Sequence, residues 1–445
     1  MKVRGLIIAC LILLALVGLL YWSEHRQPAS AVPADASLAI LKLDEGSITG
    51  LQLKKKDAAP ILLAKANSGD WQITQPQPLS ADQNMVSGML GVLSSLNAER
   101  LVEDKATDLK AYGLETPALE VDVATKNGEA KLLLGDDTPA GQAVYAMHVG
   151  DPRIFTLASF NKSSLDKSLN DLRDKRLLKL DAGKIDRIEL VKGTQDLELA
   201  RNPSTAKDEA AGTGAEWQIL KPRPLRAGEP QVEELARKLA EASMELSGSE
   251  PADEAAAFAH ATPLVTAKVN NGSGIQELQI RKDKDAYYAK SSAVDGAYKV
   301  SAELAQALDK SVDDLRNKKL FDFGFSEPGK VELHSGAQAY FLTQGTRGYD
   351  WWSNGKKMDP ESVETLLGKL RNLTATSFAD SGFTSPTIEA TVTSGDGKHV
   401  EKVLIAPAGD HYIAQRASEP ELYQLDASAV EGLQKAAAGI KPAGK

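Results

Sequence analysis

The chain has 445 residues, enough for roughly two to four domains, so it can bury several cores without disulfide bonds or metal ions. Its 61 acidic and 52 basic side chains give a net charge of −9, which argues against a nucleic-acid partner because phosphate contacts need clustered lysine and arginine. A single cysteine and six scattered histidines leave little material for a metal site or thiol chemistry. We therefore expect no cofactor and no metal ion.

An apolar segment without a charge lies near the N-terminus, at residues 5–22. At about 1.5 Å per residue, a helix of this length spans about 27 Å, close to the hydrocarbon thickness of a bilayer. Lys2 and Arg4 keep the tail at residues 1–4 in the cytoplasm by the positive-inside rule. The sequence thus predicts a single-pass anchor in the cytoplasmic membrane, a linker at 23–37, and a periplasmic or otherwise extracytoplasmic body.

A cleaved signal peptide is the main alternative to an anchor, with cleavage after Ala31. Signal peptides usually have a shorter apolar core, and the charged Glu24 and Arg26 separate the core from that cleavage position. An uncleaved anchor is therefore favoured. Cys10 loosely matches a lipoprotein acylation motif, but it stands inside the apolar run, where a buried thiol is the simpler interpretation.

The body contains an internal repeat. The segment around Trp71 recurs around Trp217, 146 residues later, with the same Trp-Gln-Ile and Pro-x-Pro-Leu spacing. The matching pairs of segments are 70–79 with 216–225, 112–117 with 258–263, and 171–175 with 314–318. A third, shortened copy opens at Trp351 and lacks the Leu-Arg-Asp ending. The predicted repeat domains are 38–180, 181–323 and 324–445.

Within each copy the hydrophobic period changes from that of strands to that of a helix. Alternating runs at 51–53 and 61–63 predict a hairpin, and Ala81 and Asp82 then open a helix with one apolar face. Its apolar positions are Val86, Met89, Leu90, Leu93 and Leu96 in the first copy, Val232, Leu235 and Leu239 in the second, and Val363, Leu366, Leu367 and Leu370 in the third.

Four further strands follow this helix, and short helices around 165–172 close the unit. The strand runs are 119–123, 131–134, 144–147 and 155–157. Their order predicts an antiparallel meander. The predicted fold class is therefore α+β, as tandem repeats of an antiparallel-sheet-plus-helix domain after one transmembrane helix.

Asp136 and Asp137 are the acidic pair for which a catalytic or cation-binding role can be considered. They stand in a Gly-Asp-Asp-Thr-Pro segment, residues 135–139, between two apolar strands, which is typical of a hairpin turn. The other copies keep turn residues there but not the paired acids. No nucleophile, metalloprotease or phosphate-binding motif occurs in the sequence, so we expect no catalytic residue.

Arg173 and Arg316 stand at the ends of the first two copies. A guanidinium could hold a ligand carboxylate or phosphate, but at a helix end it more often bonds the last carbonyls or pairs with an acid at a domain junction. We therefore favour a structural role. Trp71 and Trp217 could stack on sugars, yet their alternation with isoleucine favours packing on the neighbouring helix.

At these residues the chain resembles a bacterial family known as domain of unknown function family 4340. The family pattern runs from a Trp-x-x-x-x-Pro opening and an Ala-Asp helix start, through Tyr-Gly-Leu-x-x-Pro, to Gly-x-x-Thr-Pro with a following tyrosine and an Arg-Asp-Lys ending. The matching positions are Trp71, Pro76, Ala81, Asp82, Tyr112, Gly113, Leu114, Pro117, Gly135, Thr138, Pro139, Tyr145, Arg173, Asp174 and Lys175, with Trp217 and Arg316 in the second copy. The resemblance is good over 40–180, partial over 181–323 and faint beyond.

The resemblance implies a single-anchor envelope protein linked with ABC-type export systems and the auxiliary proteins of gliding motility. It transfers no catalytic or ligand residue to this chain. We therefore expect a non-enzymatic, membrane-anchored accessory protein that contacts ABC transporter subunits or other envelope proteins. The alternative is a periplasmic glycan-binding or hydrolytic protein with Trp71, Trp217 and the acidic turns as its contacts.

Overall fold

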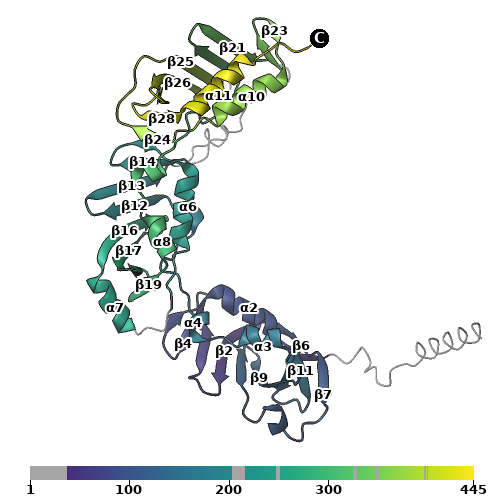
Figure 1. The fold of residues 1–445 in the computed structure, drawn as a ribbon. Helices are drawn as coiled ribbons and strands as arrows, with labels where there is room; N and C mark the ends of the chain where they lie inside the picture. Colours follow the sequence, from purple (N-terminus) through teal and green to yellow (C-terminus); the bar gives the residue numbers. More distant parts are fainter. Residues whose placement is uncertain are drawn as a thin grey trace, which may run out of the picture. The chain divides into compact units, whose positions relative to one another are not determined.

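The computed structural model describes residues 38–202, 216–246, 251–323, 328–345, 350–394, 397 and 399–444. Three large antiparallel sheets form the body (Figure 1). They belong to two compact units, of which the first ends at Lys175 and the second begins at Arg176. The predicted anchor at 5–22 and linker at 23–37 lie outside the described residues, and among those residues every helix is too short or too polar to cross a membrane.

The first unit holds a nine-stranded sheet in the order β5-β4-β3-β2-β8-β9-β10-β11-β7 and a small sheet of β1 and β6. The strands are β1 (Ala39–Lys42), β2 (Ile48–Lys55), β3 (Ile61–Lys65), β4 (Trp71–Gln75), β5 (Leu79–Ser80), β6 (Ser95–Asn97), β7 (Arg100–Glu103), β8 (Leu119–Thr125), β9 (Gly128–Asp137), β10 (Ala143–His148) and β11 (Ile154–Ala158). The helices are α2 (Gln83–Ser94), α3 (Ser159–Leu165) and α4 (Leu169–Leu172).

The second repeat, in the second unit, forms an eight-stranded sheet in the order β15-β14-β13-β12-β16-β17-β18-β19. Its strands are β12 (Arg187–Lys192), β13 (Gln195–Arg201), β14 (Trp217–Lys221), β15 (Leu225–Arg226), β16 (Thr262–Asn270), β17 (Ile275–Asp283), β18 (Ala286–Ser291) and β19 (Ala297–Val300). Its helices are α6 (Glu229–Ala240), α7 (Pro251–His260), α8 (Ala302–Leu308) and α9 (Val312–Leu315).

The third repeat, also in the second unit, forms a nine-stranded sheet in the order β23-β22-β21-β20-β25-β26-β27-β28-β24. Its strands are β20 (Lys330–Ser335), β21 (Gln338–Gln344), β22 (Trp351–Ser353), β23 (Lys356–Lys357), β24 (Ser377–Ala379), β25 (Ile388–Ser394), β26 (His399–Ala408), β27 (His411–Arg416) and β28 (Leu422–Asp426). Helices α10 (Pro360–Arg371) and α11 (Ala427–Ala438) pack together on it.

The central strand pair has the same register in all three sheets. In the first, Leu51 and Leu53 of β2 lie opposite Val123 and Val121 of β8. The corresponding pairs are Ile188 with Val269 and Leu190 with Ala267 in the second sheet, and Val331 with Val392 and Leu333 with Ala390 in the third. All these side chains are buried, so the three sheets are built on one pattern of inward-facing residues.

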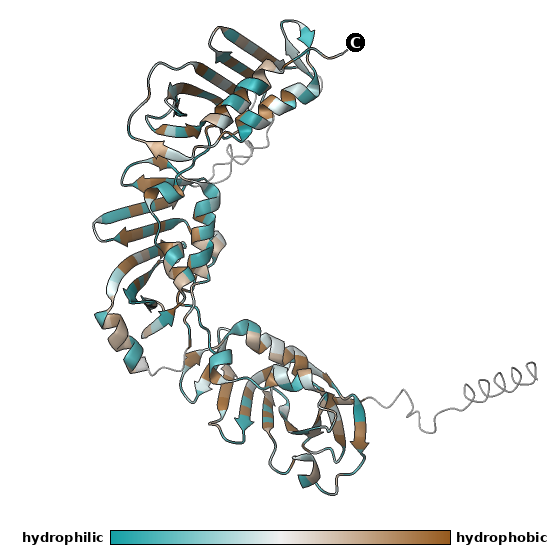
Figure 2. Ribbon diagram, in the orientation of Figure 1, coloured by the Kyte–Doolittle hydropathy of each residue, from teal (hydrophilic) through white to brown (hydrophobic). Residues whose placement is uncertain are grey.

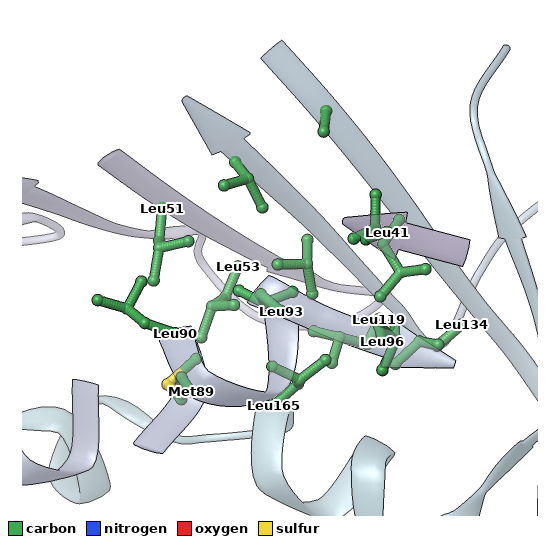
Figure 3. Close-up of a cluster of buried hydrophobic side chains, with 14 of the residues drawn as sticks. Leu41, Leu51, Leu53, Met89, Leu90, Leu93, Leu96, Leu119, Leu134 and Leu165 are labelled. Carbon is green, nitrogen blue, oxygen red and sulfur yellow. The ribbon is translucent and has the colours of Figure 1, made fainter. Parts of the chain in front are cut away.

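The predicted helix after Ala81 and Asp82 is confirmed as α2. The Asp82 carboxylate accepts the backbone N–H groups of Asn84 and Met85, both at 3.0 Å, and so caps the helix. Leu51, Leu53 and the apolar face of α2 meet in the core, as Figure 3 shows. Leu96 is buried there too, but it belongs to β6 because the helix ends at Ser94.

The strands of each sheet alternate between inward and outward side chains. In β8, for example, the residues are buried at every second position from Leu119 to Val123 and partly exposed between them. Figure 2 shows this alternation as bands of apolar and polar colour along the strands. Each sheet therefore has one face against its helices and core and one face toward solvent.

The hydrophobic cores divide the chain several residues earlier than the boundaries predicted after 180 and 323. Leu177, Leu178 and Leu180 pack in the second core, and Leu320, Phe321 and Phe323 pack in the third. Each segment pairs with the stretch of chain just after the main helix of its own repeat. The bridges are Arg176 to Ser243, three residues after α6, and Lys319 to Thr374, three residues after α10. Each repeat thus begins with an apolar segment that the sequence comparison had placed at the end of the preceding one.

The third copy is not shortened in its sheet, which has as many strands as the first. It differs in its ending, where the 12-residue α11 follows the strand β28 and no counterpart of α9 appears in the described residues. The segment after α11 bridges Pro442 to Met358, just as the segment after α9 bridges Arg316 to Ala227. A different ending therefore fills the place of the Leu-Arg-Asp motif.

Candidate functional site

The two motif tryptophans lie inside their domains. Trp71 is 5% exposed and Trp217 is 2% exposed, each in the core of its repeat. The Gln83 amide accepts the Trp71 N–H at 2.8 Å and donates to the Trp71 carbonyl at 2.9 Å. The Trp217 indole donates to the Glu233 carboxylate at 3.0 Å. Neither ring has an open face, so the interpretation of Trp71 and Trp217 as sugar contacts is wrong.

The motif proline closes the hairpin that begins at each tryptophan. Pro76 and its counterpart Pro222 both follow cis peptide bonds, between β4 and β5 and between β14 and β15. The third repeat makes the same connection with Asn354 and Gly355, which have φ angles of 48° and 74°. Positive φ at both residues is typical of the tight turn that fits a twisted hairpin. The proline is thus a structural residue of the turn.

The Tyr-Gly-Leu and Gly-Asp-Asp motifs meet at one corner of the first repeat. Gly113 has a φ of 66° and ends a short 3₁₀ turn, and a Cβ atom on it would lie 2.5 Å from the Asp136 carboxylate. A Cβ atom on Gly135 would lie well under 3.0 Å from the carbonyl oxygen of Tyr112. Both positions therefore require glycine because two backbone segments touch.

The motif tyrosines complete the same corner. The rings of Tyr112 and Tyr145 pack edge to face with their centroids 4.9 Å apart. The Tyr112 hydroxyl donates to the Glu103 carboxylate at 2.7 Å, and this hydrogen bond raises the pKa of Tyr112. Leu114 is buried, and the half-buried Pro117 leads into β8. The motif therefore fixes a loop to the ends of β9 and β10.

The acidic segment was expected as a turn, but the turn lies further along the chain. Residues 135–137 are the last of β9, and the turn is closed by a 2.8 Å bond from the Thr138 N–H to the Ala143 carbonyl. Gly135 is thus required by the close approach of Tyr112 and not by turn geometry. Asp137 pairs with Lys162 at 3.1 Å. In the described part of the chain, no three or more His, Cys, Asp or Glu side chains are grouped so that they could hold a metal ion.

The second repeat builds the same corner with different chemistry. The strand register makes Arg281 the counterpart of Gly135 and Phe258 the counterpart of Tyr112. Arg281 donates to the Phe258 carbonyl at 3.3 Å, and its guanidinium lies 4.6 Å from the centroid of that ring. A side chain thus replaces the direct backbone contact. The corner is preserved as a packing feature, although its motif residues are not.

The two arginines of the repeat endings follow the short helices α4 and α9. Each helix has a capping box, Ser168 with Asp171 and Ser311 with Asp314, and hydrogen bonds from the serine lower the pKa of both aspartates. In the first repeat, the backbone N–H of Asp174 donates to the Ser80 carbonyl at 2.9 Å. The ending therefore extends the edge of its own sheet next to β5.

The Arg316 side chain reaches into the third repeat. It is 9% exposed, and its guanidinium lies 3.4 Å from the centroid of the Phe378 ring on β24. It also pairs with Asp313 at 3.0 Å. Arg173 occupies the equivalent position in the first repeat, with its backbone bridged to Ala81. The contacts of Arg316 are those of a junction between domains.

An ionic network that is mostly buried, with Asp322 at its exposed edge, joins the second and third repeats, and sequence reasoning missed it. We call it the junction network; its members are Arg226 from the second repeat and Asp322, Glu401, Arg416, Glu419 and Tyr423 from the third. Arg226 donates to the two Glu419 oxygens at 3.2 and 3.3 Å, to the Tyr423 hydroxyl at 3.1 Å and to the Lys319 carbonyl at 2.6 Å, and it pairs with Asp322. A guanidinium suits this site because its planar array of N–H groups can donate to several acceptors at once.

Arg416 is the second cation of the junction network, with a side chain only 10% exposed. It donates to the Leu320 carbonyl at 2.9 Å. Its carboxylate partners are Asp322 at 3.2 Å, Glu401 at 3.2 Å and Glu419 at 3.0 Å. Two arginines are thus compensated by three carboxylates, which is what charges withdrawn from water require.

Burial shapes the acid–base behaviour of the junction network. It raises the pKa of Tyr423 to about 12 and raises the pKa of Glu401 against the opposing effects of the Asp322 N–H and Arg416. Burial lowers the pKa of Arg226, but Asp322, Tyr423 and Glu419 raise it overall, so Arg226 stays charged. The charges of the junction network are therefore paired with one another across the boundary between the second and third repeats.

The repeat pattern explains why the junction network escapes sequence comparison. The counterpart of Arg226 in the first repeat is Ser80, and the counterpart of Glu419 in the second repeat is Val294. Neither residue carries a charge. A comparison that looks for matching residues therefore discards the very positions that hold these two repeats together.

Comparison with known proteins places the chain in a family without assigning it an activity. A family model described as Domain of unknown function (DUF4340) matches residues 71–215 and again residues 217–394. The two matches begin at Trp71 and Trp217, so each runs from the hairpin of one structural repeat into the next. No curated protein matches the chain, and no solved structure does either. The chain belongs to the Domain of unknown function (DUF4340) family.

Proposed function

We propose that this chain is a non-enzymatic accessory protein that residues 5–22 hold in the cytoplasmic membrane. Its repeats lie on the periplasmic side and dock envelope partners, such as the subunits of an ABC-type export or gliding-motility-like system. The uncharged apolar segment behind Lys2 and Arg4 supports the anchor and its orientation.

The observation that carries this proposal is how the family-motif residues are used. Trp71, Tyr112, Gly113 and Gly135 hold together the core and corner of one domain, and Arg316 packs between two domains. These residues build a scaffold. Three sheets of one pattern, each with a solvent-facing side, suit docking to partners better than a single concave site does.

Affinity purification of the full-length chain from membranes tests the proposal. The control is the segment 1–37 with the same tag, which keeps the predicted anchor and linker and removes the repeats. Recovery of ABC permease or ATPase subunits with the full chain, and not with the control, is the expected result. Recovery of the full chain without any such subunit would overturn the proposal.

A further inference from the structure

Two exposed aromatic side chains lie on the solvent-facing side of the third sheet. Trp352 on β22 and Phe341 on β21 are each 42% exposed. Trp352 lies opposite Thr343, which is two residues from Phe341 on the same strand. Because side chains two apart on a strand share a face, the two rings are diagonal neighbours, about 7–8 Å apart at their backbones.

The fold itself does not require these aromatic rings. The strand register makes Gln72 and Gln218 the counterparts of Trp352 in the first and second repeats. The counterparts of Phe341 are Leu62 and Glu198. The first two repeats form these strands without the aromatic pair. The pair is therefore a feature of the third repeat that the shared fold does not explain.

The surroundings hold both rings in place. The His334 ring packs against Phe341 at right angles, with centroids 5.4 Å apart. A Cβ atom on Gly345 would lie 3.1 Å from Nε1 of Trp352, closer than most Cβ contacts, so glycine leaves room for the indole. The aromatic pair is thus seated before any ligand arrives, which lowers the entropy cost of binding.

The charges around the aromatic pair are already neutralised. Lys357, which lies opposite Trp352, pairs with Asp350 at 2.9 Å. Lys330 pairs with Glu332. On the next strands, Lys402 pairs with Glu389 at 2.6 Å. A phosphate or a carboxylate would have to break these pairs, so the surface favours an uncharged ligand that can also accept and donate hydrogen bonds.

The exposed area of the two rings indicates whether they bind a small ligand or a protein partner. An aromatic side chain has roughly 150–250 Å² of surface, so two rings at 42% exposure offer on the order of 200 Å². A stable protein interface needs about 800 Å² on each partner. The aromatic pair is far too small for that, yet it matches the apolar faces of one or two sugar rings.

We propose that Trp352 and Phe341 form a binding platform for an uncharged polysaccharide. The C–H faces of pyranose rings stack on the two aromatic rings. The Thr343 hydroxyl between them and the paired charges beside them bond the sugar hydroxyls. This site differs from the buried Trp71 and Trp217, and it adds a ligand to the partner docking proposed above.

The repeats themselves supply the variants that test this platform. Trp352→Gln and Phe341→Leu each install a residue that another repeat carries at the matching position, so folding should be retained and is checked by thermal unfolding. Phe160→Ala removes a 66% exposed aromatic ring from α3 in the first repeat and serves as the matched control. The full chain is kept in a detergent without a sugar headgroup, because such a headgroup would compete.

Depletion binding to three uncharged polymers, cellulose, chitin and curdlan (a β-1,3-glucan), is the measurement. We expect the wild-type chain to bind at least one of the three, with affinity at least tenfold weaker in Trp352→Gln and in Phe341→Leu and unchanged in Phe160→Ala. Absence of wild-type binding to all three polymers would overturn the proposal, as would equal binding by the folded Trp352→Gln variant. Co-purification of transporter subunits is read in a separate experiment, so the two proposals fail independently.

Discussion

The carbonyl oxygen of Tyr112 occupies the space where a side chain on residue 135 would begin. This contact ties the loop that ends in Gly113 to the last residues of β9. In this chain the Tyr-Gly-Leu and Gly-Asp-Asp segments therefore each depend on the shape of the other. The motif glycines at this corner therefore allow two backbone segments to pack in direct contact.

Gly135→Ala should destabilise the first unit by about 1–3 kcal/mol, because the new methyl group meets a carbonyl oxygen that cannot move without its loop. Urea unfolding of the full chain measures the effect. Gly88→Ala is the matched control, because Gly88 lies in α2 with open space around its Cβ position, and it should stabilise by about 0.5–1 kcal/mol. A Gly135→Ala variant as stable as wild type would contradict the close approach.

Arg226→Ala should destabilise the second unit by about 1–3 kcal/mol, because Asp322 and Glu419 lose one of the two arginines that they share and the Tyr423 hydroxyl loses a donor. The unfolding transition should also separate into steps, because the second and third repeats lose the ion pairs and hydrogen bonds that Arg226 makes between them. The control is Arg237→Ala, which removes two exposed ion pairs on α6 and should leave the midpoint unchanged. Equal effects of the two variants would show that the junction network does not couple these repeats.

Tyr423 should make the stability of the second unit depend on pH in the alkaline range. Its pKa is about 12 in the folded chain against a usual value of 10.0, so the folded state favours the protonated hydroxyl. That stabilisation is complete below pH 10 and disappears as the pH rises to about 12, with a size on the order of 2–3 kcal/mol. Urea titrations at pH 9 and 11.5 should therefore differ less for Tyr423→Phe than for wild type. An identical pH dependence in both chains would refute this role.

The position of the first boundary can be tested with two fragments. A fragment of residues 176–445 keeps Leu177, Leu178 and Leu180 in the second core, whereas 181–445 loses them. At about 2–5 kcal/mol for each buried leucine, that loss is comparable to the whole stability of a domain. We expect cooperative unfolding only for 176–445, measured by circular dichroism in urea. Equal stability of the two fragments would support the boundary after 180.

The sequence was sufficient for the elements whose period is strong. The apolar face of α2, the alternation of β2 and β8, and the cap at Asp82 all follow from local rules, and the structure has them where predicted. The prediction was wrong where contacts between distant segments, and not the local pattern, determine the secondary structure. Leu96 continues the helical spacing of α2 but turns into β6, because it pairs with Leu41.

The junction network was beyond sequence reasoning for a physical reason. Arg226 and Glu419 are 193 residues apart, and each charge resembles an ordinary surface residue until the fold buries it. Sequence reasoning missed the exposed aromatic pair for a different reason. The repeat singles out Trp71 and Trp217, which are buried, whereas Trp352 departs from the repeat and is exposed.

Docking to envelope partners requires the repeats to lie outside the cytoplasm, so the location of the body decides whether the proposed function holds. Cys10 is the single cysteine, so a Cys10→Ala chain with Ser68→Cys on an exposed turn has one reactive thiol. Intact spheroplasts are treated with a membrane-impermeant maleimide. We expect full labelling before lysis. Labelling that appears only after lysis would place the repeats in the cytoplasm and rule out the proposed function.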